Sequence, residues 1–263
     1  FRQKLVLINM SSLLAILLST NLVNSAQITG WVYADNWFEL YFNGEKVATD
    51  TIESIPNNAM YVDFTAPAEG SYSFAFLAQD NSNASTGLEQ RMDGTGITWT
   101  GDWCMGDGGI LMHLSDGTVT SSDWKCTVVM EGPLETACQD ECIDLDVMSP
   151  SQCTVQYNEY PSCWNETICS SEDSWLSATE YTIDDVGMGR TPDSSSYDYP
   201  NVCSGLDATS TTEIYETEGC VPKDKFDTDT TSTPIWTSDL DYHNRIICRY
   251  SYCVEGSTNC TAP

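Results

Sequence analysis

Apolar and polar side chains alternate along several short segments in the first half of the chain. The alternation runs through residues 31–46 (WVYADNWFELYFNGEK), 59–67 (AMYVDFTAP), 70–80 (GSYSFAFLAQD) and 108–118 (GGILMHLSDGT). A repeat of two is the side-chain period of a β-strand with one buried face, and no segment of useful length has the helical period. Asn-Gly and Asp-Gly pairs in and between these segments favour tight turns. The pattern therefore predicts an all-β fold of antiparallel strands.

Residues 31–46 are mostly apolar at their even positions, but their odd positions are different. They combine aromatic rings with carboxylates: Trp31, Tyr33, Asp35, Trp37, Glu39 and Tyr41. In one continuous strand these side chains share a face. Rings stack on the C–H face of a sugar while carboxylates accept hydrogen bonds from its hydroxyls, so we predict Trp37, Tyr33 and Asp35 as ligand-binding residues. The alternative is that the second half of the chain covers this face as a second packing layer, with Trp124, Trp175 or Trp236 as partners.

The cysteines and the first residues of the chain indicate export. Arg2 and Lys4 precede an apolar run and then small residues, so residues 1–26 are predicted to be a signal peptide and the protein to be secreted or attached to the cell surface. An even number of cysteines in such a protein indicates six disulfides, whereas a zinc site usually also needs histidine, and the chain has two. The cysteines are Cys104, Cys126, Cys138, Cys142, Cys153, Cys163, Cys169, Cys203, Cys220, Cys248, Cys253 and Cys260.

The net charge and the glycosylation sequons restrict the classes of partner that the protein can bind. A formal net charge of −29 repels nucleic acid and anionic membrane surfaces, while it is compatible with divalent cations, basic partners or neutral glycans. No segment after the signal is long enough to form a transmembrane helix. Three Asn-X-Ser/Thr sequons, at Asn83, Asn165 and Asn259, predict glycosylated surface loops.

Residues 92–109 (MDGTGITWTGDWCMGDGG) form a segment rich in glycine, aspartate and tryptophan. Carboxylate oxygens on a glycine-rich loop suit calcium, so Asp93, Asp102 and Asp107 are predicted ligands of a structural Ca²⁺. Trp99 and Trp103 in the same loop are predicted to stack on a saccharide. The alternative is a hairpin connection tied by Cys104, with its tryptophans packed against the edge of the fold.

The amino-acid composition of the chain changes near residue 130. Residues 27–130 are poor in cysteine and rich in predicted strands, whereas residues 131–263 hold ten cysteines and long Ser/Thr/Asp stretches. We expect one β-sandwich over residues 27–263, whose second half completes the sheets and carries long loops held by disulfides. A separate small cysteine-rich domain is the alternative.

Several pieces of the chain, taken together, carry a resemblance to a known family. These pieces are ADNWFELYFNGEKV, EGSYSFAFLAQD, DGTVTSSDWKC, DSWLSATEY, IWTSDL and NRIICRY. Together they resemble the galactose-binding-like jelly roll that occurs as a carbohydrate-binding accessory module in glycoside hydrolases and surface proteins. The resemblance implies an antiparallel jelly-roll-like β-sandwich that binds glycans. The order of the pieces and the cysteine-rich insertions depart from the usual module, which suggests a permuted order or two pseudo-modules.

The chain lacks the common catalytic motifs. It has no G-x-S-x-G, no H-E-x-x-H and no phosphate-binding loop, and His113 and His243 lie far apart in sequence. We therefore predict a non-catalytic module that binds a polysaccharide or a cell-surface or matrix glycoprotein. Two alternatives stay open: an acidic matrix protein without a small-ligand site, and a glycosidase whose two carboxylates leave no local motif. Arg245 and Arg249 are expected to form ion pairs within the fold.

Overall fold

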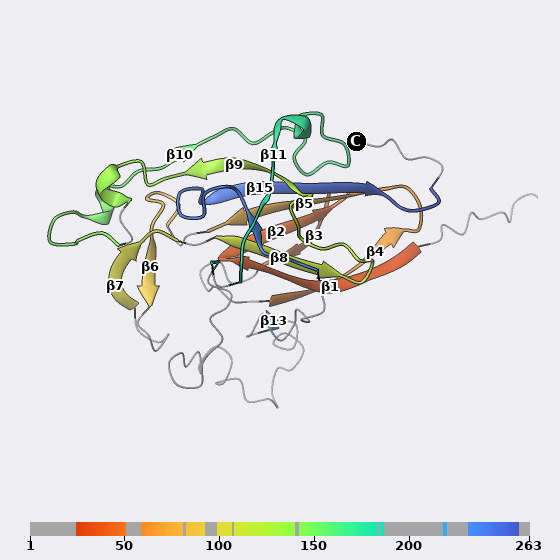
Figure 1. Cartoon of the computed structure of the whole chain (residues 1–263), viewed down its shortest axis with the longest axis horizontal. Coiled ribbons are helices and arrows are strands. Elements are labelled where there is room, and N and C mark those ends of the chain that lie inside the picture. The colour runs from red at the N-terminus through yellow and green to blue at the C-terminus, as the bar shows by residue number, and fades with distance from the viewer. Residues whose placement is uncertain are drawn as a thin grey trace, which may run out of the picture.

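The computed structural model describes residues 25–50, 59–80, 83–92, 99–106, 108–139, 142–183, 185–186, 218–219 and 231–257. Two antiparallel sheets face each other, and Figure 1 shows β9 and β15 in one layer above β1 and β8 in the other. No α-helix occurs in these ranges, so the prediction of an all-β fold is confirmed. None of the described helices is long or apolar enough to cross a membrane.

The six-stranded sheet has the order β12-β14-β8-β1-β4-β13. Its strands are β1 (Ser25–Asp35), β4 (Ala59–Pro67), β8 (Gly109–Leu114), β12 (Thr179–Glu180), β13 (Glu218–Gly219) and β14 (Ile235–Trp236). The seven-stranded sheet has the order β10-β9-β15-β5-β2-β3, and β11 also pairs with β9. Its strands are β2 (Trp37–Phe42), β3 (Glu45–Thr49), β5 (Ser71–Gln79), β9 (Lys125–Glu131), β10 (Gln156–Tyr157), β11 (Leu176–Ser177) and β15 (Arg245–Cys253).

A separate hairpin and three short 3₁₀ helices complete the described elements. The hairpin is β6 (Glu89–Met92) with β7 (Trp99–Cys104), and the helices are η2 (Thr136–Cys138), η3 (Pro150–Gln152) and η4 (Glu172–Ser174). Strands from both halves of the sequence share each sheet: β14 pairs with β8, and β15 lies between β5 and β9.

The hydrophobic core lies between the two sheets. Each strand contributes the side chains of one parity, as a two-residue repeat requires. The buried members include Val32, Phe38, Leu40, Val62, Phe74, Phe76, Ile110, Met112, Trp124, Trp236 and Ile246. Trp124 and Trp236 therefore belong to the central core and are not partners of the odd-position rings of residues 31–46.

The prediction that residues 31–46 form one continuous strand with one aromatic face is wrong. β1 ends at Asp35 in the six-stranded sheet, and β2 begins at Trp37 in the seven-stranded sheet. The chain thus crosses from one sheet to the other at Asn36. Because the even positions face the common core on both sides of this crossing, the odd positions lie on the outer faces of opposite sheets.

Four disulfides join eight of the predicted cysteines. The pairs are Cys104–Cys142, Cys126–Cys248, Cys138–Cys153 and Cys163–Cys169. Cys126 and Cys248 are register partners on β9 and β15, although they are 122 residues apart in sequence. Cys253 ends β15, and Cys203, Cys220 and Cys260 lie outside the described residues.

Candidate functional site

A pocket of about 370 Å³ opens at one end of the sandwich. It is lined by Met105, Gln139, Asp239, Asp241 and Tyr242. In Figure 1 the β6–β7 hairpin and the loop that precedes β15 both lie at this end of the sheets. The volume falls in the range of small-ligand sites, and we call this feature the loop-end pocket.

The loop from Thr237 to Asn244 supplies one wall of the pocket. It follows β14, whose Trp236 is buried and donates a hydrogen bond from Nε1 to the carbonyl of His243 at 2.9 Å. The Thr237 hydroxyl lies 2.7 Å from His243 Nδ1, and the backbone N–H of Tyr242 donates to Asp239 Oδ1 at 3.0 Å. These bonds close the loop on itself, so Asp239 and Tyr242 are held in place.

The same loop is attached to the ends of β9 and β5. The Gly132 N–H donates to the Tyr242 carbonyl at 2.9 Å, and Asn244 Nδ2 donates back to the Gly132 carbonyl. The Asp80 N–H donates to the Asn244 carbonyl at 2.7 Å. The wall is therefore continuous with the seven-stranded sheet, which is a rigid support for a binding site.

Two disulfide-bonded segments supply the opposite wall. Met105 directly follows β7 and packs, together with Trp103, on a buried cluster of Leu88, Cys138, Ile143 and Cys153. The Ile143 N–H donates to the Trp103 carbonyl at 2.8 Å. Gln139 Nε2 donates to the Pro133 carbonyl at 2.9 Å, which fixes its amide at the pocket. The Cys104–Cys142 and Cys138–Cys153 bonds hold these segments together.

The loop-end pocket is negatively charged. Asp239 and Asp241 are exposed at its surface, and none of the lining residues that the structure describes is basic. Burial raises the pKa of the Tyr242 hydroxyl, and the nearby carboxylates of Glu131, Asp239 and Glu135 raise it further. The pocket therefore favours a cation or a hydrogen-bond donor over an anion.

Two glycines of the predicted acidic loop have a packing role beside the pocket. A Cβ atom on Gly106 would overlap the carboxylate of Asp80, which is fully buried, and one on Gly108 would overlap the ring of Trp236. Only a residue without a side chain allows this approach. Composition suggested a calcium loop here, but at these two positions the glycines serve close packing over the end of the core.

The residues predicted in the acidic loop have different outcomes. Trp103 is half-buried beside the pocket wall, and Asp102 is exposed on β7. Trp99 begins β7, but its side chain, like Asp93 and Asp107, lies outside the described residues. Within the described ranges no group of three or more His, Cys, Asp or Glu side chains is arranged to hold a metal ion. The predicted calcium site stays a prediction.

Tyr33, Asp35 and Trp37 lie in packing layers. Tyr33 is 0% exposed and packs with Leu111 and Val186, and Asp35 is 5% exposed at the end of β1. Trp37 is half-buried against a cluster that contains Trp175, and its Nε1 donates to the Asp50 carbonyl at 3.0 Å. A glycan cannot reach Tyr33 or Asp35 in this arrangement, so the packing-layer alternative describes them better.

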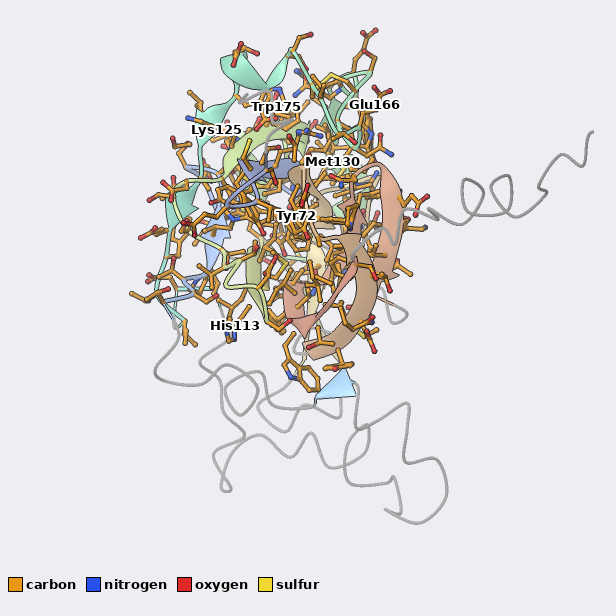
Figure 2. All side chains as sticks on the ribbon, turned by 90° about the vertical axis from the view of Figure 1, so that its right-hand side faces the viewer. Tyr72, His113, Lys125, Met130, Glu166 and Trp175 are labelled. Carbon is orange, nitrogen blue, oxygen red and sulfur yellow. A yellow bond between two sulfur atoms is a disulfide. The ribbon has the colours of Figure 1, made fainter. Side chains whose placement is uncertain are left out.

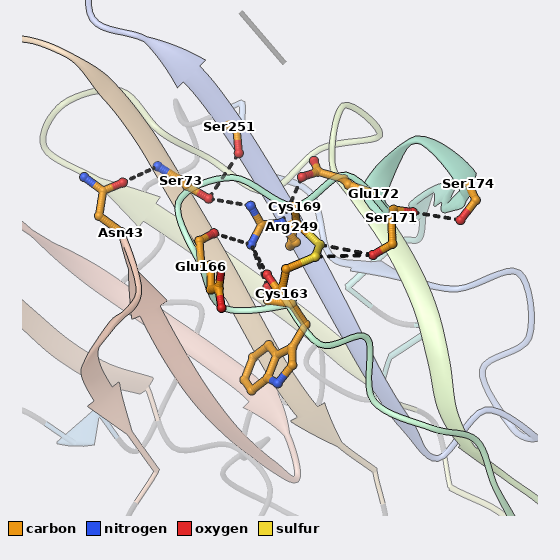
Figure 3. Close-up of polar contacts among 11 residues, drawn as sticks. Asn43, Ser73, Cys163, Glu166, Cys169, Ser171, Glu172, Ser174, Arg249 and Ser251 are labelled. Carbon is orange, nitrogen blue, oxygen red and sulfur yellow. Dashed lines mark hydrogen bonds and ion pairs between the residues drawn. A yellow bond between two sulfur atoms is a disulfide. The ribbon is translucent and has the colours of Figure 1, made fainter. Parts of the chain in front are cut away.

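A buried arginine, Arg249, holds a cover on the outer face of the seven-stranded sheet (Figure 3). Its side chain is 1% exposed, and its Nε donates to the Glu172 carboxylate at 2.8 Å. Nη1 donates to the carbonyls of Trp164 and Glu166 at 2.6 and 2.7 Å, and Nη2 donates to the Ser73 hydroxyl at 2.8 Å. The prediction of an ion pair within the fold is confirmed for Arg249, and its role is structural.

The cover consists of the loop from Cys163 to Cys169 and the segment that leads to Trp175. Trp164 meets the ring of Tyr41 edge to face, with centroids 4.8 Å apart. Figure 2 shows Glu166 and Trp175 on one side of the sandwich and His113 on the opposite side. The odd-position rings of β2 are therefore covered by the cysteine-rich half of the chain.

The outer face of β1 and β4 carries aromatic and polar side chains that the sequence analysis did not select. Trp31 and Tyr61 are register partners with ring centroids 5.4 Å apart, and Tyr61 is 38% exposed. Further along the same face, Gln27 donates to Asp63 and accepts from the Thr65 hydroxyl at 3.1 Å. These side chains lie on the open face of a sheet, and small-ligand sites are concave, so we rank this surface below the loop-end pocket.

The sequence analysis did not select Asp239, Asp241 and Tyr242, which lie in the stretch DLDYHNR beside His243. Two aspartates just before a tyrosine, ahead of the last strand, were the available signal. Of the sequons, Asn83 accepts hydrogen bonds from the N–H and hydroxyl of Ser85 at 3.0 and 2.7 Å, and Asn165 lies half-buried in the cover. Asn259 lies outside the described residues.

Comparisons with protein-family models, with curated proteins and with solved structures found no match for this chain.

Proposed function

We propose that this chain is a secreted, non-catalytic module that binds a polysaccharide or the glycans of a cell-surface or matrix glycoprotein. The observation that carries the proposal is the loop-end pocket, which combines two carboxylates, an amide, a phenol ring and a thioether in about 370 Å³. A sugar residue needs both kinds of surface: polar groups for its hydroxyls and an apolar surface for its C–H face.

Each lining residue has a role in this proposal. Asp239 and Asp241 accept hydrogen bonds from sugar hydroxyls, and Gln139 supplies an amide from the opposite wall. Tyr242 and Met105 provide the apolar surface. Trp103 of the β6–β7 hairpin packs on the same buried cluster as Met105.

Calcium has a supporting role in the proposal. Of the three predicted ligands only Asp102 lies among the described residues, and the contacts proposed at the loop-end pocket do not include the ion. If Ca²⁺ binds Asp93, Asp102 and Asp107, a chelator will weaken glycan binding without abolishing the fold.

The test is a glycan array probed with disulfide-intact protein, with calcium and with a chelator. We expect binding to one glycan class, and we expect Tyr242→Ala and Asp239→Asn each to weaken it by about tenfold or more. Tyr61→Ala and Asp63→Asn are matched controls on the outer face of β4 and leave binding unchanged. Loss of binding in the controls alone would move the site to that face.

The alternatives give different results in the same experiment. A matrix protein binds no glycan on the array and self-associates with calcium, which analytical ultracentrifugation measures. A glycosidase hydrolyses at least one substrate in a chromogenic glycoside panel. Either result, from protein that is folded by circular dichroism, would replace the binding-module proposal.

A further inference from the structure

We propose that the loop-end pocket selects a glycan that carries a protonated amine, so that its preferred ligand contains hexosamine residues whose nitrogen is not acylated. The inference rests on the proposed glycan-binding function and names the ligand class for the same pocket. It follows from the charge of the pocket, from its two carboxylates and from the phenol ring and thioether in the same lining.

The charge excludes one class of glycan. Among the described lining residues two are aspartates and none is basic, and Glu131 and Glu135 lie close enough to act on the Tyr242 hydroxyl. The two arginines of β15 are engaged elsewhere: Arg245 donates to Gln79 and Tyr160, and Arg249 is buried against Glu172. A uronate or a sulfated sugar would therefore be repelled by the carboxylates of this pocket.

The carboxylates suit an ammonium group better than a hydroxyl. An ammonium group offers three N–H donors and a full charge, and charge-assisted hydrogen bonds are about twice as strong as neutral ones. Asp239 is held by the N–H of Tyr242 at 3.0 Å through Oδ1 alone. Because a carboxylate accepts about four hydrogen bonds, this contact fixes Asp239 and leaves it capacity for a ligand.

Tyr242 and Met105 favour the same ligand. A cation over or beside a phenol ring is attracted by the ring quadrupole, and the thioether offers a polarisable apolar contact for the C–H face of the sugar. An N-acetyl group would replace the cation with a neutral amide, so both the charge pairing and the ring attraction would be lost. The pocket thus distinguishes an amine from an acetamide on an otherwise identical sugar.

The test compares three oligosaccharides by isothermal titration calorimetry: a β-1,4-linked glucosamine hexamer, the same hexamer fully N-acetylated, and a uronic acid hexamer. The titrations are run at about pH 5.5, where the amines of the glucosamine hexamer are protonated. We expect the glucosamine hexamer to bind at least about tenfold more tightly than the acetylated one, less so at high salt, and the uronic acid hexamer not to bind.

Two double variants separate the pocket from the general negative charge of the protein. Asp239→Asn with Asp241→Asn removes the preference for the amine, because it weakens binding of the glucosamine hexamer at least about tenfold more than binding of the acetylated hexamer. Glu159→Gln with Asp173→Asn changes the net charge equally at exposed positions outside the pocket lining and keeps the preference. Folding of both is checked by circular dichroism.

The outcomes distinguish failure of the amine inference from failure of the proposed glycan-binding function. Equal binding of the amine and acetamide hexamers, or loss of the preference in both double variants, overturns the amine inference while glycan binding stands. If folded protein binds none of the hexamers and no glycan on the array, the proposed function itself is wrong.

Discussion

The outer faces of β1 and β2 start from the same stretch of sequence and end in different environments. On the seven-stranded sheet, Trp37 and Tyr41 of β2 lie beneath the Cys163–Cys169 loop and Trp175. On the six-stranded sheet, Tyr33 of β1 is buried with Leu111 and Val186, but Trp31 lies beside the exposed Tyr61. The odd-position pattern is alike on both strands, so the pattern does not decide which face is covered.

The difference lies in how polar groups are satisfied. A loop laid on a sheet buries backbone carbonyls, and each needs a donor. Arg249 projects from β15 into the cover and supplies those donors, whereas the outer face of β1 and β4 keeps its polar residues Gln27, Asp63 and Thr65 exposed to water. Covering the outer face of the seven-stranded sheet therefore depends on one buried cation, Arg249.

Replacing Arg249 has the largest expected effect on the free energy of unfolding. Arg249→Met leaves the Glu172 carboxylate and the Trp164 and Glu166 carbonyls without their donor, so we expect a loss of about 3–5 kcal/mol of unfolding free energy in urea denaturation. Lys46→Met, which breaks the exposed ion pair with Glu39, is the control and costs at most about 1 kcal/mol. Equal effects would mean that the cover does not depend on Arg249.

Removing the Cys163–Cys169 disulfide has the second largest expected effect on stability. Cys163→Ser with Cys169→Ser opens a loop of six residues, for which chain entropy predicts a loss of about 2 kcal/mol. The fluorescence of Trp164 and Trp175 should shift to longer wavelength as the cover loosens, while Trp124 and Trp236 stay in the core. An unchanged emission spectrum would show that Arg249 alone holds the loop.

Alkaline pH should weaken the covered face next. Burial raises the pKa of Tyr41 to about 12, and the hydrogen bond to Glu39 and its charge add to this. The stability is fully present below the unfolded pKa of about 10 and is lost as the pH rises through the folded value. We expect a loss of about 1 kcal/mol for Tyr41, less than the full equivalent of the shift because solvent screens a partly exposed group.

Thermal unfolding of the wild type and of Tyr41→Phe between about pH 9 and 12 measures this contribution. The variant should lose less stability across this range. Burial also raises the pKa of Tyr72, Tyr181, Tyr250 and Tyr252, so part of the alkaline loss persists in Tyr41→Phe. Identical pH profiles for the two proteins would contradict the role assigned to Tyr41.

The open face should show the smallest effect. A double-mutant cycle with Trp31→Ala and Tyr61→Ala measures the edge-to-face contact, for which we expect a coupling of about 0.5–1.5 kcal/mol. The matching cycle on the covered face uses Tyr41 and Trp164. If both cycles give the same coupling, covering the face adds nothing to the ring contact itself.

Local pattern predicted much of the fold because strand alternation and turn pairs are properties of neighbouring residues. Segments 59–67 and 108–118 contain β4 and β8, as expected. The crossing at Asn36 was missed because Ala34 and Phe38 keep the same parity whether the chain continues in one sheet or passes to the other. Alternation shows which side chains of a strand face the core, but it does not show which of the two sheets the strand belongs to.

The candidate site was predicted less well for the same reason. Composition predicted a binding role for the segment that contains Trp103 and Met105, and this segment supplies one wall of the loop-end pocket. The opposite wall, Asp239 to Tyr242, comes from a loop more than a hundred residues later in the chain. Only tertiary folding brings the two walls together, so no local spacing could have paired them.

The Cys126–Cys248 bond has a consequence for proteolysis. It ties two adjacent strands of one sheet across a separation of 122 residues, so the chain between them forms a covalently closed ring on the sandwich. A protease that cuts one peptide bond anywhere in this ring leaves a nicked protein that migrates as a single species on a non-reducing gel. Extracellular processing within the ring would therefore change the local chain ends while both fragments stay joined to the same fold.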